Sequence, residues 1–316
     1  MTDIILQTIN EMMGFVPKTV FIMFCSISIM YIIIKNGLLK YLCKFFKPVV
    51  SILKLPEQVV ASSMIALGSA LSANIMLSEL NKKNILTDDE TYLGGILNTV
   101  SITLKEIFTY QLAIIMPILG LKAGLIYLLC FFSAAVIKCV YIYSYKKMKS
   151  YSENLIKFEK TSSEKKNVIE LSYKKQMKIF LKTSLIYISI TFIILFAMNA
   201  GLAEYIKNFV APLTKILKLP SELSVPIAAF IFSPIVGASA VGSLLKKNIV
   251  NDIDAAFAVI LGSLLMLPLF SLRGGLARNI SIFGTKLGVR IISTSTILSM
   301  ISRLIFVAAI LIYKAV

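Results

Sequence analysis

Long apolar runs alternate with short polar segments along this chain. The clearest runs are residues 20–34, 125–136, 183–200 and 291–312. A helix needs about 20 mainly apolar residues to cross the hydrocarbon core of a bilayer. With small polar residues included, the pattern predicts spans at about residues 19–39, 57–80, 121–144 and 285–308. The predicted fold class is therefore all-α, a polytopic helical membrane protein.

Residues 81–120, between the predicted spans at 57–80 and 121–144, do not have the length of a single span. A polar turn at residues 81–90 leads into residues 91–104 and then 105–120. Together the last two stretches are too long for one comfortable span and short for two. We therefore expect either a hairpin that re-enters the membrane or two short spans between residues 91 and 120.

One pattern occurs twice, at a fixed offset of 164 residues. Ile52-Leu53-Lys54-Leu55-Pro56 returns as Ile216-Leu217-Lys218-Leu219-Pro220, and Lys82-Lys83-Asn84-Ile85 returns as Lys246-Lys247-Asn248-Ile249. No gap is needed between them, and further identities continue the register on both sides. A fixed offset over most of each half indicates two homologous repeats produced by gene duplication.

The duplication and the charges together suggest a division of the chain. Residues 1–18 read as an N-terminal interfacial helix. Residues 19–144 and 183–316 are the two transmembrane repeats. Residues 145–182 form a linker with eleven lysines against four glutamates, which the positive-inside rule assigns to the cytoplasm. If each repeat crosses an odd number of times, the repeats have inverted topology, which the loop charges favour; an even count, giving parallel repeats, is the alternative.

Composition supports a membrane location and removes several functions. The chain is 57% hydrophobic and 16% charged, with a net charge of +17. The positive charge fits cytoplasmic loops and the anionic leaflet of a cell membrane, and no basic segment is interleaved with aromatic residues as nucleic-acid binding requires. Histidine is absent, and the four cysteines form no CxxC pair. We therefore expect no metal, no cofactor, no nucleic acid and no enzymatic activity.

Small and polar residues in the middle of the predicted second span are the first candidate site. Proline and glycine at this depth in the second repeat permit a broken helix, and transporters use such breaks to bind solutes. Close packing of helices through small residues is the alternative reading. The candidates in the two repeats are Ser69, Ser72, Asn74, Ser233 and Ser239.

Ionisable and amide side chains in the following segments are the second candidate site. A charge within a span is costly unless it is paired or hydrated, so it is a functional candidate. Helix capping by Lys105 and Glu106 and snorkelling by Arg273 are the alternative. We read Arg290 and Arg303 as anchors or buried pairs, and residues 88–90 as a solvated turn. The candidates are Asn98, Glu106, Tyr110, Arg273, Arg278 and Asn279.

The stretch Lys105-Glu106-Ile107-Phe108-Thr109-Tyr110-Gln111, with Gly120-Leu121-Lys122 after it, resembles a segment of the nucleoside recognition, or Gate, family of membrane domains. That family includes spore-maturation membrane proteins, and similar domains occur in ferrous-iron and concentrative nucleoside transporters. The resemblance implies paired, oppositely oriented Gate-like units. The second repeat departs from the pattern, with Phe270 at the position of Glu106 and Gly274 at that of Tyr110.

These observations favour a secondary transporter or permease for a small polar solute or ion, working by alternating access between the repeats. Glu106 would bind a cation or proton, with Arg273 or Arg278 balancing its charge. The alternative is a non-transporting scaffold or assembly factor that acts through the basic linker. Both hypotheses are compatible with a homo-oligomer or with another membrane protein as a partner.

Overall fold

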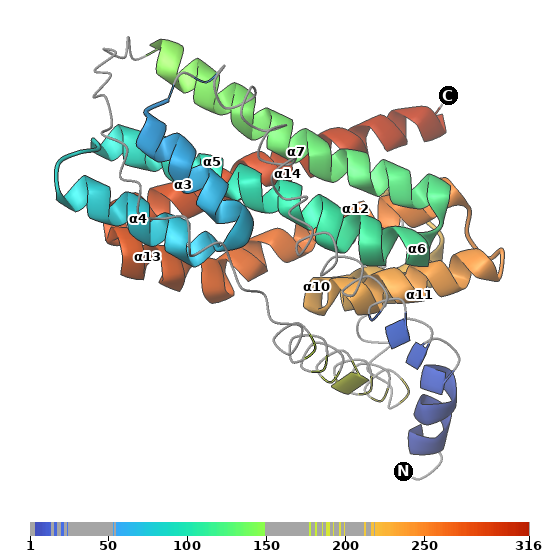
Figure 1. The fold of residues 1–316 in the computed structure, drawn as a ribbon. Helices are drawn as coiled ribbons and strands as arrows, with labels where there is room; N and C mark the ends of the chain where they lie inside the picture. The colour runs from blue at the N-terminus through green and yellow to red at the C-terminus, as the bar shows by residue number, and fades with distance from the viewer. Residues whose placement is uncertain are drawn as a thin grey trace.

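The computed structural model describes residues 55–148, which we call the first half, and residues 219–315, the second half (Figure 1). It also describes residues 4–13, which are helical, and isolated positions elsewhere. The predicted first span at 19–39 and nearly all of the linker at 145–182 lie outside the described residues. Every regular element in the described part is helical, as the hydropathy pattern predicts.

Four continuous helical segments are long and apolar enough to cross a membrane: Asp88–Leu119, Leu121–Met148, Asp252–Phe270 and Thr285–Lys314. Two belong to each half. Their apolar side chains also face outward, with Leu129, Phe132, Leu304 and Ile305 about half exposed. Exposing so many large apolar side chains on adjacent helix faces is unfavourable in water and favourable in lipid. The structure is that of a multi-pass integral membrane protein.

Residues 57–82 form two short helices that fold back on each other, α3 (Glu57–Gly68) and α4 (Ala70–Lys82). Pro56 is the N-cap of α3, and Ser69 between the helices is extended (φ −142°, ψ 105°). The Ser62 hydroxyl reaches the Ala73 carbonyl at 3.4 Å, which a straight helix would place about 16 Å along its axis. Each helix is only about 18–20 Å long. The prediction of a full span at 57–80 is therefore wrong, since the small polar residues allow a hairpin.

The second half repeats this hairpin. A short 3₁₀ turn, η3 (Ser221–Leu223), leads into α10 (Ser224–Phe232), and α11 (Pro234–Lys246) follows. Ser233 between them is extended (φ −150°, ψ 110°). Gly237 packs directly on the backbone of Phe230, so that a Cβ there would lie 2.5 Å from its Cα. In Figure 1 the hairpin α3–α4 lies near one end of the long helices, and α10–α11 near the other.

The segment after the first hairpin is one continuous helix rather than a second hairpin. It consists of α5 (Asp88–Glu106), a π-helical stretch η1 (Ile107–Ile115) and α6 (Met116–Leu119). A capping box between Thr87 and Glu90 starts it, and Gly120 with φ +81° ends it. At 32 residues it is about 48 Å long, so it tilts or projects beyond the hydrocarbon core. The expected hairpin or pair of short spans between residues 91 and 120 is thus wrong.

The second half builds its long segments in the same way. Asn251 caps α12 (Asp252–Phe270) by accepting a hydrogen bond from the Asp254 amide at 2.8 Å. A π-helical stretch η4 (Ser271–Leu276) and α13 (Ala277–Phe283) continue it to Gly284, with φ +80°. The last helix, α14 (Thr285–Ala315), follows, as α7 (Leu121–Met148) follows Gly120.

Helices α7 and α14 pack side by side in opposite directions across the centre of the molecule (Figure 1). Ser133 near the middle of α7 bonds Ser302 at 2.7 Å, whereas Tyr145 near its end bonds Arg290 near the start of α14 at 2.6 Å. Two apolar cores flank this pair. One is centred on Phe230 and Phe257 and the other on Tyr92.

Unusual backbone positions occur in pairs. Asn84 and Asn248 both have φ +56°, the only non-glycine residues with positive φ in the described part. Gly120 and Gly284 share φ near +80°, and Ser69 and Ser233 share an extended backbone. The members of each pair are 164 residues apart (248 − 84, 284 − 120 and 233 − 69). The offset found in the sequence therefore also relates the breaks and turns of the fold.

Candidate functional site

A chain of polar side chains joins the first hairpin to α5. Asn98 is fully buried. Its Oδ1 accepts a hydrogen bond from the Ser62 hydroxyl at 2.9 Å, and its Nδ2 donates to Asn74 Oδ1 at 2.9 Å. The structure thus brings together two of the predicted residues, Asn74 and Asn98, and adds Ser62, which the sequence reading did not single out. Ser69 lies half-buried at the break between the two helices.

The second hairpin lacks an equivalent amide cluster. At the positions 164 residues after Ser62, Asn74 and Asn98, the chain has Pro226, Ala238 and Gly262. Ser239 is buried in α11, and Ser233 is half-buried at the break. The carbonyl of Ser233 accepts the Gly237 amide at 3.0 Å, which satisfies part of the backbone there. The amide cluster is therefore present at the first hairpin and has no counterpart at the equivalent positions of the second.

Glu106 lies where α5 passes into the π-helical stretch, and Tyr110 is half-buried one turn further on. Glu106 is exposed. It interacts electrostatically with its neighbour Lys105, with Lys138 of α7 and with Arg303 of α14. π-Helical stretches are frequent at functional sites because they displace side chains from the regular helical register.

Of the two predicted basic partners of Glu106, Arg273 and Arg278, the structure describes the side chain of Arg278 alone. Arg278 is exposed on α13. Asn279 is buried, but its side-chain amide donates to the Gly275 carbonyl of its own helical segment at 2.8 Å. The side chains of Ser72 and Arg273 lie outside the described residues. Lys138 and Arg303, rather than Arg278, are the described cations of the other helices that interact with Glu106.

From the sequence, Arg303 is interpreted as an anchor or part of a buried pair and Lys138 is not singled out, although the repeat could have revealed it. Position 138 corresponds to 302 and position 139 to 303 under the offset of 164. Each repeat therefore carries one basic residue at almost the same depth of its last helix. We call Glu106, Lys138 and Arg303 the central charge cluster.

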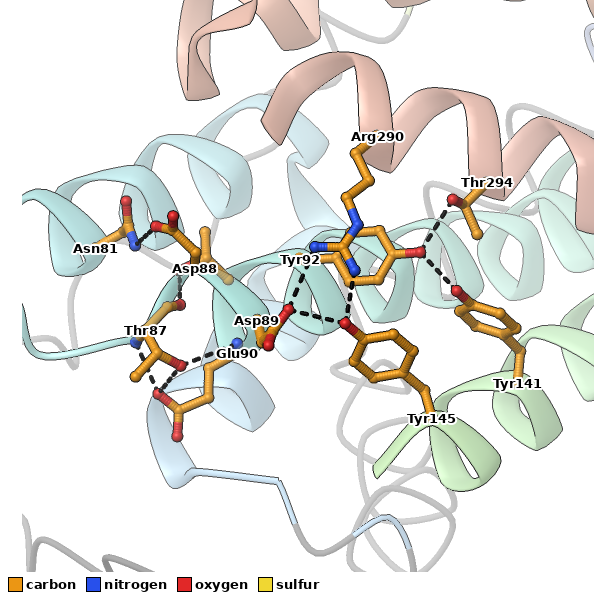
Figure 2. A network of polar contacts seen from close by, with 11 residues as sticks. Asn81, Thr87, Asp88, Asp89, Glu90, Tyr92, Tyr141, Tyr145, Arg290 and Thr294 are labelled. Carbon is orange, nitrogen blue, oxygen red and sulfur yellow. Dashed lines mark hydrogen bonds and ion pairs between the residues drawn. The ribbon is translucent and has the colours of Figure 1, made fainter. Parts of the chain in front are cut away.

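A second polar cluster ties the halves together at the end of α7 (Figure 2). The Arg290 guanidinium of α14 bonds Asp89 at 3.2 Å and the Tyr145 hydroxyl at 2.6 Å. It also lies over the Tyr92 ring, 3.9 Å from the ring centroid. Tyr145 in turn donates to Asp89 at 2.8 Å. We call Asp89, Tyr92, Tyr145 and Arg290 the interhelix lock.

Hydroxyl groups line α14 between the lock and the central charge cluster. Thr294 bonds the Tyr92 hydroxyl at 3.0 Å, and Ser295 donates to Thr99 of α5 at 3.0 Å. Ser302 accompanies Ser133 of α7. Ser295 and Ser302 are seven residues, or about two turns, apart and therefore share a helix face, and both side chains contact the first half. These hydroxyls bond one another across the interface; in the described part no three His, Cys, Asp or Glu residues meet as metal ligands would.

Comparison with known proteins gives relatives but no activity. No family model matches this chain, and no solved structure matches it. It is similar along nearly its whole length to three proteins of Methanocaldococcus jannaschii. Uncharacterized protein MJ0880 is 25% identical, covering 94% of this chain and 97% of the relative. Uncharacterized protein MJ1556 is 26% identical, with 97% and 98% covered. Uncharacterized protein MJ0871 is 22% identical, with 92% and 91% covered.

Proposed function

We propose that the protein is a secondary transporter for a small polar solute or ion, in which two inverted repeats alternate access to a site between them. The observation that carries this proposal is the pair of half-length hairpins, broken at Ser69 and Ser233, which enter the long-helix bundle near opposite ends (Figure 1). Helices broken inside the membrane expose backbone groups that can bind a solute.

The contacts between the halves support the inverted repeat. The Ser78 hydroxyl of α4 donates to the Ile282 carbonyl of α13 at 2.6 Å. Gly242 of α11 lies against the Ile118 carbonyl of α6. Adding 164 to residue 78 gives 242, and subtracting 164 from 282 gives 118, so the two contacts are the same with the halves exchanged. Equivalent helices α7 and α14 also run in opposite directions, as inversion requires.

The interhelix lock supports a closed state at one end of the molecule. It joins α5 and α7 of the first half to α14 of the second half. The positions that correspond to Asp89 and Arg290 in the exchanged arrangement are Ile253 and Ile126, both packed against an apolar core. The halves are thus joined by polar contacts at one end, whereas the equivalent positions at the other end are apolar and the ion pair there, Lys314 with Asp254, lies within the second half.

Glu106 is the residue of the proposed site that also carries the resemblance to Gate domains, some of which occur in transporters. It is an accessible carboxylate at the start of a π-helical stretch, near the interface of α7 and α14. Its chemistry suits binding of a proton or cation, or neutralisation of a neighbouring basic group.

A disulfide between the halves tests transport. Thr99 and Ser295 oppose each other, with their hydroxyl oxygens 3.0 Å apart. In a background with Cys25, Cys43, Cys130 and Cys139 replaced by alanine, Thr99→Cys with Ser295→Cys should form a disulfide that holds the halves together. Proteoliposomes are incubated with a mixture of small polar metabolites, and accumulated solutes are identified by mass spectrometry.

We expect accumulation of at least one solute by the reduced double variant, its loss on oxidation and its return on reduction. The two single-cysteine variants are the controls and should be indifferent to oxidation. If no solute accumulates in any reduced sample, or if oxidation leaves uptake unchanged, alternating access between these halves is refuted.

A further inference from the structure

Two basic side chains are buried in the membrane-spanning part of the molecule. Lys138 of α7 and Arg303 of α14 are each only 3% exposed. Both lie well inside their helices, ten residues before the end of α7 and twelve before the end of α14. A buried charge costs several kcal/mol unless an opposite charge, water or a ligand compensates it.

The described groups in direct contact with Arg303 are uncharged. One guanidinium nitrogen donates to the Ser299 carbonyl at 3.0 Å. The guanidinium carbon lies 4.4 Å from the centroid of the Phe131 ring. The Nε atom is buried and has no hydrogen-bond acceptor among the described residues. A carbonyl and a ring face are weak partners for a full positive charge in an apolar surrounding.

The described residues supply too few negative charges for this region. Glu106 is the carboxylate that interacts with both Lys138 and Arg303. Its strongest electrostatic partner is the adjacent Lys105, so one carboxylate serves three basic side chains. The excess of positive charge points to a negatively charged ligand.

The two cations lie on either side of the centre of the α7–α14 pair. The contacts between Ser133 and Ser302 and between Tyr145 and Arg290 place residue 138 level with residue 297 of α14. Arg303 is six residues further along, or about 9 Å along the helix axis. Each half therefore contributes one basic side chain to the same region, and the two side chains are near enough to interact electrostatically.

We propose that Lys138 and Arg303 form a binding site for a small oxyanion, with Glu106 as the internal counter-ion that the bound anion displaces. Guanidinium and ammonium groups together provide several donors, which suits carboxylate and phosphate oxygens. The proposal rests on the proposed transport function in one respect: the bound anion would be the transported solute. The same chemistry could come from the phosphate of an anionic lipid.

Binding is measured without any gradient, so that it is independent of transport. Purified protein in phosphatidylcholine nanodiscs is heated in chloride, inorganic phosphate, acetate or succinate at constant ionic strength, and the unfolding midpoint is followed. A parallel series replaces part of the phosphatidylcholine by phosphatidylglycerol. We expect at least one soluble oxyanion to raise the midpoint of the wild type in a saturable manner.

Variants then assign the site. Lys138→Gln and Arg303→Gln should each weaken the apparent affinity about tenfold or more, since each removes a charge-assisted contact. Glu106→Gln should strengthen it, because the competing carboxylate is gone. The matched controls are Lys122→Gln and Lys286→Gln, exposed lysines at equivalent places in the two halves, and both should bind as the wild type does.

Stabilisation by phosphatidylglycerol alone, lost in the same variants, identifies a lipid headgroup as the ligand and excludes a transported anion. No stabilisation in any series, or no gain of affinity in Glu106→Gln, overturns the site. If the wild type binds an anion but the reduced double-cysteine variant transports no solute, the anion site is supported and the proposed transport function is refuted. If solute is transported but no anion binds, the transport function is supported and the anion site is refuted.

Discussion

At the scale of single residues, Asn98 has the most demanding environment. It is fully buried, and both ends of its side-chain amide are used, one by Ser62 and one by Asn74. Breaking such hydrogen bonds is costly in apolar surroundings, because the donor and acceptor that lose their partner cannot form a hydrogen bond to water instead. The amide therefore fixes the hairpin α3–α4 against α5, whatever solute the break at Ser69 meets.

Replacing Asn98 by alanine should lower the free energy of unfolding by about 1–3 kcal/mol, since it removes the buried hydrogen bonds that Asn98 makes with the Ser62 hydroxyl and with Asn74 Oδ1. Asn74→Ala should cost less, because Asn74 is only half-buried and one contact is lost. Thermal unfolding in detergent of both single variants and the double variant measures the coupling. Additive losses in the double variant would show that the two amides act independently.

At the scale of elements, Gly120 and Gly284 turn the chain between the long helices. Their φ values are +81° and +80° with ψ near 174° and 171°, a region that is almost exclusive to glycine. A Cβ at Gly120 would only touch Leu245 at 3.8 Å, and one at Gly284 would meet nothing within 4 Å. Substitution there is therefore limited by backbone strain and not by space.

Gly120→Ala and Gly284→Ala should each lower the free energy of unfolding by about 1–3 kcal/mol. Asn84→Gly and Asn248→Gly are matched controls in the same two repeats. Their positive φ of +56° suits asparagine and glycine alike, so both should lie close to the wild type. Thermal unfolding distinguishes the pairs, and equal stability of all four variants contradicts the strain argument.

The sequence predicts some of the helix breaks and misses the path of the chain around them. Proline and glycine near Ser233 permit the break that the structure has in the second repeat, whereas the break at Ser69 was not predicted. Hydropathy did not reveal that the chain reverses there, because a straight span of residues 57–80 has the same composition as a hairpin. The continuous helix from Asp88 to Leu119 was missed for a similar reason, since its polar middle at Lys105 and Glu106 resembles a turn. Lys138 was overlooked because the residues around it are apolar.

At the scale of the whole molecule, the turns after the two hairpins lie near opposite ends of the bundle (Figure 1). Lys83 follows α4 and Lys247 follows α11, and both are exposed. If the long helices cross the membrane, an inverted repeat presents these lysines on opposite sides.

Single cysteines at Lys83 and Lys247, in the background without native cysteines, should therefore differ in reaction with an impermeant thiol reagent applied to intact cells. We expect Lys247→Cys to react and Lys83→Cys to react only after the cells are opened, because the turn at Lys83 lies at the end of the molecule where α7 enters the basic linker. Labelling of both in intact cells, or of neither, would show parallel halves.

The one-sided interhelix lock makes the two ends of the molecule unequal in energy. Its ion pair is partly exposed, with Arg290 at 41% and Asp89 at 23% of their side-chain surface, so it contributes about 0.2–1 kcal/mol. The stacking of Arg290 on Tyr92 adds a similar amount. Each 1.4 kcal/mol is a tenfold ratio of populations. In the proposed transport cycle the lock would favour the form in which this end is shut, and a solute could oppose that preference only by binding the opened form more tightly.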